Sequence, residues 1–303
     1  MVNKLVVCVF GLLTLTYCNA PKKEKVKSPL KSETSNYSPR IFTHQLPRKL
    51  SENSALIIYN NLIWTCNDSG GKAKIYGLSR DGEIKEEIRI KNATNNDWED
   101  ITQDEQHIYV GDFGNNSGNR DDLKIYKIEK TEMANSSDVE AEIIQFSYSD
   151  QKENGFKLFA TSFDCEALAD INGKLFLFLK DWQNETTTIY HVPKTKGTFK
   201  LDPMQSLNIG TLITGADFCP NNNMLALIGY HDHMPVLHIF KKVSRKKPFG
   251  EEHEVFSMES ITGAQTEGVC FLGNDTLLFS CERTSKFPAR IFLSDLKKLL
   301  NDN

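Results

Sequence analysis

The sequence lacks the signatures of several large protein classes. It is 39% hydrophobic and 25% charged over 303 residues, a balance that is typical of a globular protein and excludes collagen-like, disordered and multi-span membrane proteins. Its net charge of −4 lacks the basic excess of nucleic-acid binders. We therefore expect one large globular domain, or two small ones, without a nucleic-acid partner.

The common catalytic motifs are missing too. The sequence has no G-x-S-x-G nucleophile elbow, no Walker loop and no H-E-x-x-H zinc helix. Its seven cysteines are odd in number and irregularly spaced, so they predict neither a disulfide framework nor a zinc knuckle. The five cysteines after the leader lie in strand-like runs and are expected to be buried thiols, with a Cys270–Cys281 pair as the alternative.

The N-terminus predicts export. Lys4 precedes the apolar stretch Leu5–Tyr17, which is too short to span a bilayer and suits the core of a signal peptide. The stretch ends in Leu-Thr-Tyr-Cys and resembles a bacterial lipobox, in which Cys18 carries the lipid. Residues 1–18 are thus a signal peptide, and the membrane is a predicted partner through this anchor. The alternative is a secretory leader cut near Ala20.

Residues 19–40 predict a flexible linker. They are rich in Lys, Ser and Pro, with Val26, Leu30 and Tyr37 as their only large apolar residues, and they bury too little surface to offset chain entropy. The protein is therefore expected in the cell envelope as a lipoprotein, or secreted, with residues 41–303 as its folded domain.

The rest of the chain is a repeat. An Ile-aromatic pair recurs at positions 75, 125, 189, 239 and 291, at steps of 50, 64, 50 and 52 residues. Each pair follows a second β-rich run such as HIYVG or LFLFLK and is bounded by turn signals such as Asn172-Gly173. Four antiparallel strands per unit of about 50 residues predict an all-β protein with the blades of a β-propeller. A two-sheet sandwich is the alternative, but it does not explain the period.

Five units can be counted, and the last one, which starts near Glu267, runs out of chain before an outer strand. The run Arg40–Leu46 precedes the first inner strand. We predict that this N-terminal segment supplies the missing outer strand and closes the ring.

Acidic residues recur at equivalent positions of the units. Ser54, Glu99, Glu166, Gly215 and Glu267 open the inner strands, whereas Asp68, Asp112, Asp181, Asp232 and Glu282 end the second strands. Both sets are expected on one rim of the ring. Clustered carboxylates repel unless they are protonated, paired or metal-bound, and hard oxygen ligands suit Ca²⁺. We therefore predict a metal site from Glu99, Glu166, Glu267, Asp68, Asp112, Asp181, Asp232 and Glu282. The alternatives are turn capping, above all for Asp68 and Asp112, and structural hydrogen bonds for the three Glu.

Other side chains near this rim are weaker candidates. His231 and His233 have the spacing of a metal pair on a strand, but loop histidines are commonly just exposed. Trp98 and Trp182 flank acidic positions and are either rim aromatics for a ligand such as a sugar or part of the blade packing. Arg120 and Arg283 are the nearest candidates for binding phosphate.

The segments NDSGG and GDFGNN, together with NATNNDWEDIT, DCEALA and QTEGVCF, resemble a family of secreted bacterial propellers close to the SdiA-regulated and phytase-like groups. The resemblance covers roughly residues 41–298. It implies a propeller, usually of six blades, that often carries Ca²⁺ in or on its channel. Some members hydrolyse phosphate esters or lactones.

Two functions remain open at this point. The first is an envelope lipoprotein whose propeller holds Ca²⁺ and binds a small molecule, glycan or protein. The second is a Ca²⁺-dependent hydrolase of phosphoesters or lactones, which needs a cation with open coordination positions and a nearby base. The sparse cationic residues near the motifs favour the binding protein.

Overall fold

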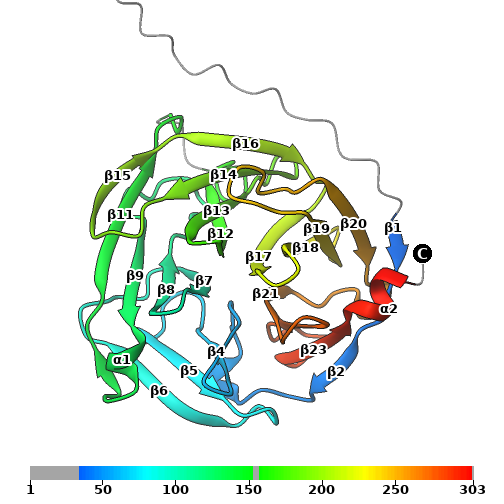
Figure 1. Cartoon of the computed structure of the whole chain (residues 1–303), viewed down its shortest axis with the longest axis horizontal. Helices are drawn as coiled ribbons and strands as arrows, with labels where there is room; N and C mark the ends of the chain where they lie inside the picture. The colour runs from blue at the N-terminus through cyan, green and yellow to red at the C-terminus, as the bar shows by residue number, and fades with distance from the viewer. Residues whose placement is uncertain (1–33, 153–156, 302–303) are drawn as a thin grey trace, which may run out of the picture.

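The protein is a five-bladed β-propeller (Figure 1). The computed structural model describes residues 34–152 and 157–301. The predicted signal peptide, Cys18 and the linker up to residue 33 lie outside the described residues. The count of five blades in the repeat is confirmed.

Each blade runs outward from an inner strand, and the inner strands of neighbouring blades contact one another around the axis. Blade 1 contains β3 (Ile57–Tyr59), β4 (Leu62–Thr65), β5 (Lys74–Leu78) and β6 (Ile84–Ile90). Blade 2 contains β7 (Trp98–Gln103), β8 (His107–Asp112), β9 (Lys124–Glu129) and β11 (Glu142–Tyr148). Blade 3 contains β12 (Asp164–Ile171), β13 (Lys174–Lys180), β14 (Thr186–Val192) and β16 (Pro203–Asn208). Blade 4 contains β17 (Leu212–Cys219), β18 (Met224–His231), β19 (Met234–Lys241) and β20 (Glu252–Ser257). Blade 5 contains β21 (Thr266–Phe271), β22 (Thr276–Cys281), β23 (Arg290–Asp295) and β2 (Arg40–Thr43).

The hydrophobic core lies between the blades rather than at the axis. Five buried clusters each join two adjacent blades around the ring. The Ile-aromatic repeat follows from this arrangement, because neighbouring residues of a strand point to opposite faces. In β9, for example, Ile125 packs toward blade 3 and Tyr126 toward blade 1. The isoleucine of every repeat packs against the next blade and the aromatic against the previous one.

The N-terminal segment closes the ring as predicted. β2 pairs antiparallel with β23, with Arg40 opposite Leu293, and completes blade 5. The strand before it, β1 (Thr34–Asn36), pairs in parallel with β20 of blade 4. β10 (Asp138–Val139) and β15 (Gly197–Leu201) pair in parallel with β6 and β11 in the same way. In all three cases the segment before an outer strand covers the edge of the preceding blade, which protects that edge from pairing with other chains.

The inner strands approach one another closely. A Cβ on Gly268 would lie 2.4 Å from the carbonyl carbon of Ala55 in the next blade, so only glycine fits there. The buried carboxylate of Asp100 accepts hydrogen bonds from the backbone N–H of Leu168 at 2.8 Å and of Ala216 at 3.4 Å. Asp100 thereby ties three blades together at the axis.

Helices are short and peripheral. They are α1 (Lys130–Met133), α2 (Leu296–Asn301) and the 3-10 turns η1 (Arg48–Leu50) and η2 (Glu259–Ile261). Among the described residues, none of the helices has the length and apolar character needed to cross a membrane. The five cysteines of the propeller are buried thiols, so Cys270 and Cys281 are not paired.

Candidate functional site

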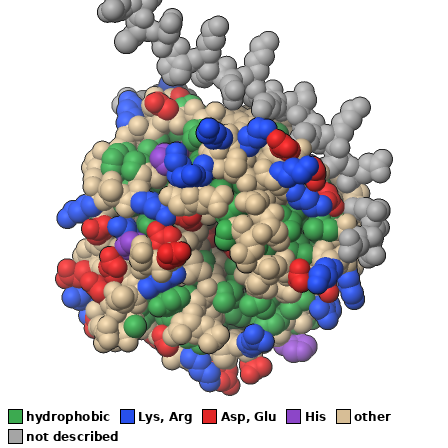
Figure 2. Space-filling view, in the orientation of Figure 1, with side chains coloured by type: hydrophobic (Ala, Val, Ile, Leu, Met, Phe, Trp, Pro, Cys, Tyr) green, Lys and Arg blue, Asp and Glu red, His purple; other side chains and the backbone are tan. Residues whose placement is uncertain are grey.

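A cavity of about 810 Å³ opens where the inner strands begin and the second strands end. Six of the eight carboxylates predicted from the repeat line it: Asp68, Glu99, Glu166, Asp232, Glu267 and Glu282. Acidic and basic side chains are interspersed over the surface in Figure 2. The net charge of the whole chain is only −4, but acidic groups are concentrated in this one cavity.

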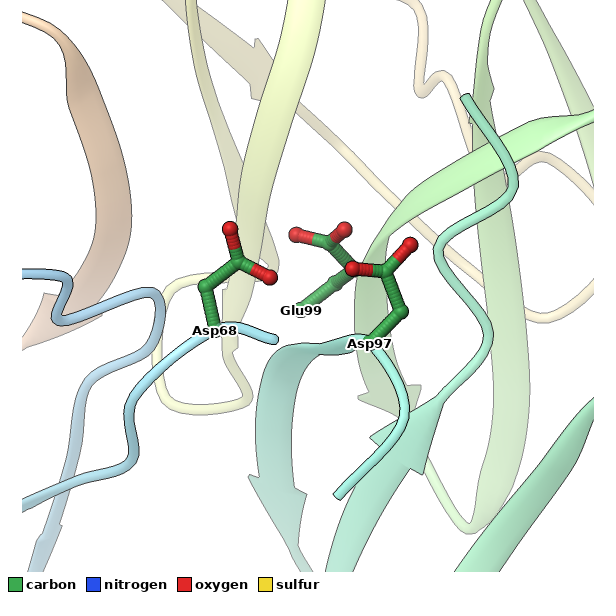
Figure 3. A group of neighbouring side chains, drawn as sticks. All are labelled: Asp68, Asp97 and Glu99. Atoms are coloured by element: carbon green, nitrogen blue, oxygen red, sulfur yellow. The ribbon is translucent and has the colours of Figure 1, made fainter. Parts of the chain in front are cut away.

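Three carboxylates from two blades converge at the wall of this cavity, and two of them, Asp68 and Glu99, line it. Asp68 follows β4, Asp97 immediately precedes β7 and Glu99 lies within β7. One oxygen from each lies within 4.8 Å of the others, and Figure 3 shows the three carboxylates turned toward one another. We call Asp68, Asp97 and Glu99 the carboxylate cluster.

Local contacts hold the cluster in place. The amide of Asn95 donates hydrogen bonds to the backbone carbonyls of Asn67 at 2.9 Å and Asp68 at 2.6 Å, which ties the loop of blade 1 to the start of blade 2. Gly114 packs against the other side. A Cβ there would lie 2.1 Å from Oε1 of Glu99 and 2.5 Å from Oδ2 of Asp97. Gly114, the second glycine of the GDFGNN segment, therefore leaves the space in which these two carboxylates lie.

Burial and mutual repulsion disfavour three charges in the cluster. Burial, and then the charge of Asp68, raise the pKa of Asp97 to about 8. Burial and the charge of Glu166 raise the pKa of Glu99 well above its ordinary value. The apo cluster is therefore expected to retain protons at neutral pH, because three adjacent carboxylates cannot all ionise without a cation.

Glu99 has no partner for its charge. Its side chain is only 6% exposed, yet its carboxylate makes no hydrogen bond to any residue in the described part of the chain. Oδ1 of Asp68 is likewise buried without a hydrogen-bond partner among those residues. Buried polar groups are nearly always satisfied, so the orphaned oxygen of Asp68, beside the unpaired Glu99 carboxylate in the cavity wall, points to a ligand that completes the site.

Lys180 neutralises another carboxylate of the cavity. At the end of β13 it contacts both oxygens of Glu166, at 2.8 and 2.7 Å. Its ammonium also lies 4.2 Å from the ring centroid of Trp182 and 5.1 Å from that of Tyr230. Burial opposes its charge, but the carboxylate of Glu166 outweighs burial, and the pKa of Lys180 lies above its ordinary value. Glu166, one of the predicted metal ligands, is therefore paired with a lysine within the protein.

Glu267 and Glu282 form a second acidic pair in blade 5. Glu267 is 5% exposed, and burial raises its pKa to about 7. Burial and the charge of Glu267 raise the pKa of Glu282 to about 9. These two groups face the same cavity but lie outside the carboxylate cluster.

The three remaining predicted ligands do not join the cluster. Asp112 is fully buried behind the cavity, where it accepts hydrogen bonds from Arg120 at 2.9 Å and from the backbone N–H of Asp97 at 3.1 Å. Asp181 caps its own turn by accepting hydrogen bonds from the backbone N–H groups of residues 183 and 184. Asp232 lies on the rim with its side chain 94% exposed. The turn-capping alternative thus describes Asp181.

Sequence reasoning missed Asp97 and Lys180. A signal for Asp97 was present, because Asp97-x-Glu99 and Asp164-x-Glu166 are the same motif in consecutive blades, and residues two apart on a strand share a face. The two aspartates differ in their contacts: Asp164 accepts hydrogen bonds from Asn115 N and Trp182 Nε1. Nothing in the sequence distinguishes them, because the partners of Asp164 come from other blades and turns.

Of the weaker candidates near the rim, some line the cavity and others do not. Trp98 is fully buried and packs between blades, whereas Trp182 lines the cavity. Arg120 pairs with Asp112 and Asp122, so it is not a free phosphate ligand. The cationic residues that line the cavity are Lys180 and Lys286.

Comparisons with known proteins identify no family. No family model and no curated protein matches the chain. Similar solved structures include a glucose dehydrogenase, with 9% identity over 82% of this chain and 97% of that one and a TM-score of 0.47. The nidogen/laminin complex matches with 13% identity over 81% and 76% and a TM-score of 0.44. A protein of unknown function from Bacteroides caccae matches with 10% identity over 76% and 66% and a TM-score of 0.34. At these values none of the three informs the function of this chain.

Proposed function

We propose that this protein is an exported, lipid-anchored propeller that binds a ligand at its acidic cavity and holds a divalent cation, Ca²⁺, at Asp68, Asp97 and Glu99. The propeller itself supports a ligand- or partner-binding role. The observation that carries the cation is Glu99, a carboxylate that is buried, unpartnered and directed at two others. A divalent ion would remove the repulsion from Asp68 that, after burial, raises the pKa of Asp97.

The donor set favours Ca²⁺ over softer metals. All three donors are carboxylates, whereas zinc and copper sites are typically built with Cys or His. Ca²⁺ takes six to eight oxygen ligands, which three carboxylates cannot fully supply, so positions would remain for water or ligand oxygens on the cavity side. The resemblance to SdiA-regulated and phytase-like propellers points to the same ion.

Hydrolysis of phosphoesters or lactones is the second candidate. It is favoured by the same open positions on the cation and by Glu282, whose raised pKa keeps a proton available in the cavity. The ion pair of Lys180 with Glu166 argues against a phosphate clamp, because that lysine is already neutralised. A screen of phosphoester and lactone substrates with Ca²⁺ tests this candidate, and turnover that is lost in Glu282→Gln would support it.

The anchoring part of the proposal concerns residues outside the described part of the chain. It rests on the apolar stretch Leu5–Tyr17 and on Cys18 at its end. Mass spectrometry of the mature protein is expected to find a diacylated or triacylated Cys18 at the N-terminus. An unmodified N-terminus downstream of Cys18 would show a secreted protein instead.

Thermal unfolding with and without Ca²⁺ tests the cation site. A ligand that binds only the folded state at 100 times its Kd adds about 2.7 kcal/mol to the free energy of unfolding, which corresponds to roughly 5–10 °C in Tm. Glu99→Gln should abolish this shift, because it removes a charged ligand at nearly constant volume. Asp232→Asn is the matched control: it removes a carboxylate from the rim of the same cavity and should leave the shift intact. The absence of a shift in chelator-treated wild type would refute the site.

A further inference from the structure

The acidic cavity is much larger than an ion. At about 810 Å³ it lies within the range of cavities that bury small organic ligands. Asp68 and Glu99 of the carboxylate cluster line one part of its wall, and aromatic side chains line another. A ligand that fills the cavity would therefore contact both the carboxylates and the aromatic rings.

The aromatic part is a pair of rings at the mouth. Phe159 and Trp182 lie with their centroids 4.7 Å apart, and both line the cavity. Phe159 is 52% exposed and has a φ of 55°, a conformation that costs about 1 kcal/mol or more in a residue with a side chain. With about half of its surface exposed, Phe159 gains less from hydrophobic burial than a core phenylalanine does.

Backbone contacts hold this aromatic pair in place. The N–H of Phe159 donates to the carbonyl of Asn116 at 2.9 Å, and the N–H of Trp182 donates to the carbonyl of Thr161 at 3.1 Å. The amide of Gln183 also donates to the carbonyl of Ala160. Residues 159–161 are thus fixed to the turn that follows β13, with Phe159 lining the cavity.

One receptor for an organic ammonium group in this cavity is already occupied. Its arrangement of carboxylate and aromatic faces, which is the usual receptor for such a group, is already filled by the ammonium of Lys180 against Glu166, Trp182 and Tyr230. The rim instead offers neutral hydrogen-bonding side chains: Asn116, Thr262, Gln265, Thr284 and Ser285.

We propose that the cavity binds a saccharide whose ring stacks on Phe159 and Trp182 and whose adjacent hydroxyls complete the coordination of a cation held by Asp68, Asp97 and Glu99. The apolar face of a sugar ring matches an aromatic ring, and its hydroxyls match both the amide-rich rim and the open positions of Ca²⁺. This inference rests on the proposed function and adds the class of ligand.

Fluorescence titration tests the inference. Trp64 and Trp98 are buried, at 1% and 0% exposure, so a saccharide in the cavity is expected to change mainly the emission of Trp182. The probes are mannobiose, cellobiose, chitobiose and lactose at millimolar concentration, each with Ca²⁺ and with EDTA. We expect at least one to bind in Ca²⁺ and none in EDTA.

Two neighbouring residues supply the variant and its control. Phe159→Ala should weaken saccharide binding about tenfold, the order of one lost aromatic contact, and keep the Ca²⁺ shift in Tm. Leu158→Ala removes the adjacent side chain, which is 58% exposed and does not line the cavity, and should change neither quantity.

The outcomes distinguish the two proposals. A Ca²⁺ shift in Tm without binding of any probe would overturn the saccharide inference and leave the cation site standing. The absence of a Ca²⁺ shift would overturn both. Saccharide binding that persists in EDTA, equal binding by Phe159→Ala, or binding of spermidine in place of the saccharides would each overturn the inference alone.

Discussion

Replacing Lys180 with methionine removes the cation that contacts Glu166. Both partners are almost fully buried, with side chains 4% and 5% exposed, so solvent compensates poorly for the lost ammonium. Removing one partner of a buried pair costs about 3–5 kcal/mol, which lowers Tm by roughly 10 °C in a domain of this size. The loss should shrink as the pH falls, because a protonated Glu166 needs no counter-charge.

The double variant Glu166→Gln/Lys180→Met is the control for this prediction. It removes both charges at similar volume and should regain most of the lost stability, since neutral replacements of buried pairs are often tolerated. Thermal or urea unfolding of wild type, both single variants and the double variant gives the coupling energy. A double variant as unstable as the sum of the singles, or a Lys180→Met variant as stable as wild type, would refute the reasoning.

Three further predictions follow from the cavity and the ring closure. The folded state holds a proton on Glu282, whose pKa is raised from 4.5 to about 9, so stability in EDTA should fall as pH rises through this window. Glu282→Gln should reduce that fall, and an unchanged Tm profile would contradict it. Gly114→Ala would crowd Glu99 and Asp97 and should abolish the Ca²⁺ shift in Tm, whereas Gly71→Ala, whose Cβ would meet only Asn95 at 3.5 Å, should retain it. Removal of residues 1–33 should preserve Tm, but removal through Thr43 deletes β1 and β2 and should cause aggregation in light scattering; equal behaviour of the two truncations would contradict the closure.

The blades could be predicted because their signal is local and repeated. The Ile-aromatic pair recurs since each third strand must fill the interface to both neighbouring blades, as Ile125 and Tyr126 do. Because the last blade lacked an outer strand, the run Arg40–Leu46 was predicted to supply it, and Arg40–Thr43 of this run forms β2. β1 escaped prediction because its three residues are polar and its pairing with β20 is decided by the edge it covers.

The site could be predicted only in part. Repeat register places Glu99, Glu166 and Glu267 in one cavity because equivalent strand positions share a rim. It does not show that Glu166 is paired with Lys180 or that Asp97 faces Asp68, since those contacts depend on side-chain directions across blades. Asp112 illustrates the limit: it has the same register as Asp68, yet it is bound by Arg120 behind the cavity.

Calorimetric titration of Ca²⁺ into the chelator-treated propeller tests the central claim most directly. We expect one saturable site per chain, which is lost in Glu99→Gln and kept in Asp232→Asn, because only the first residue belongs to the carboxylate cluster. Absence of saturable binding in wild type, or equal binding by the two variants, would contradict the account.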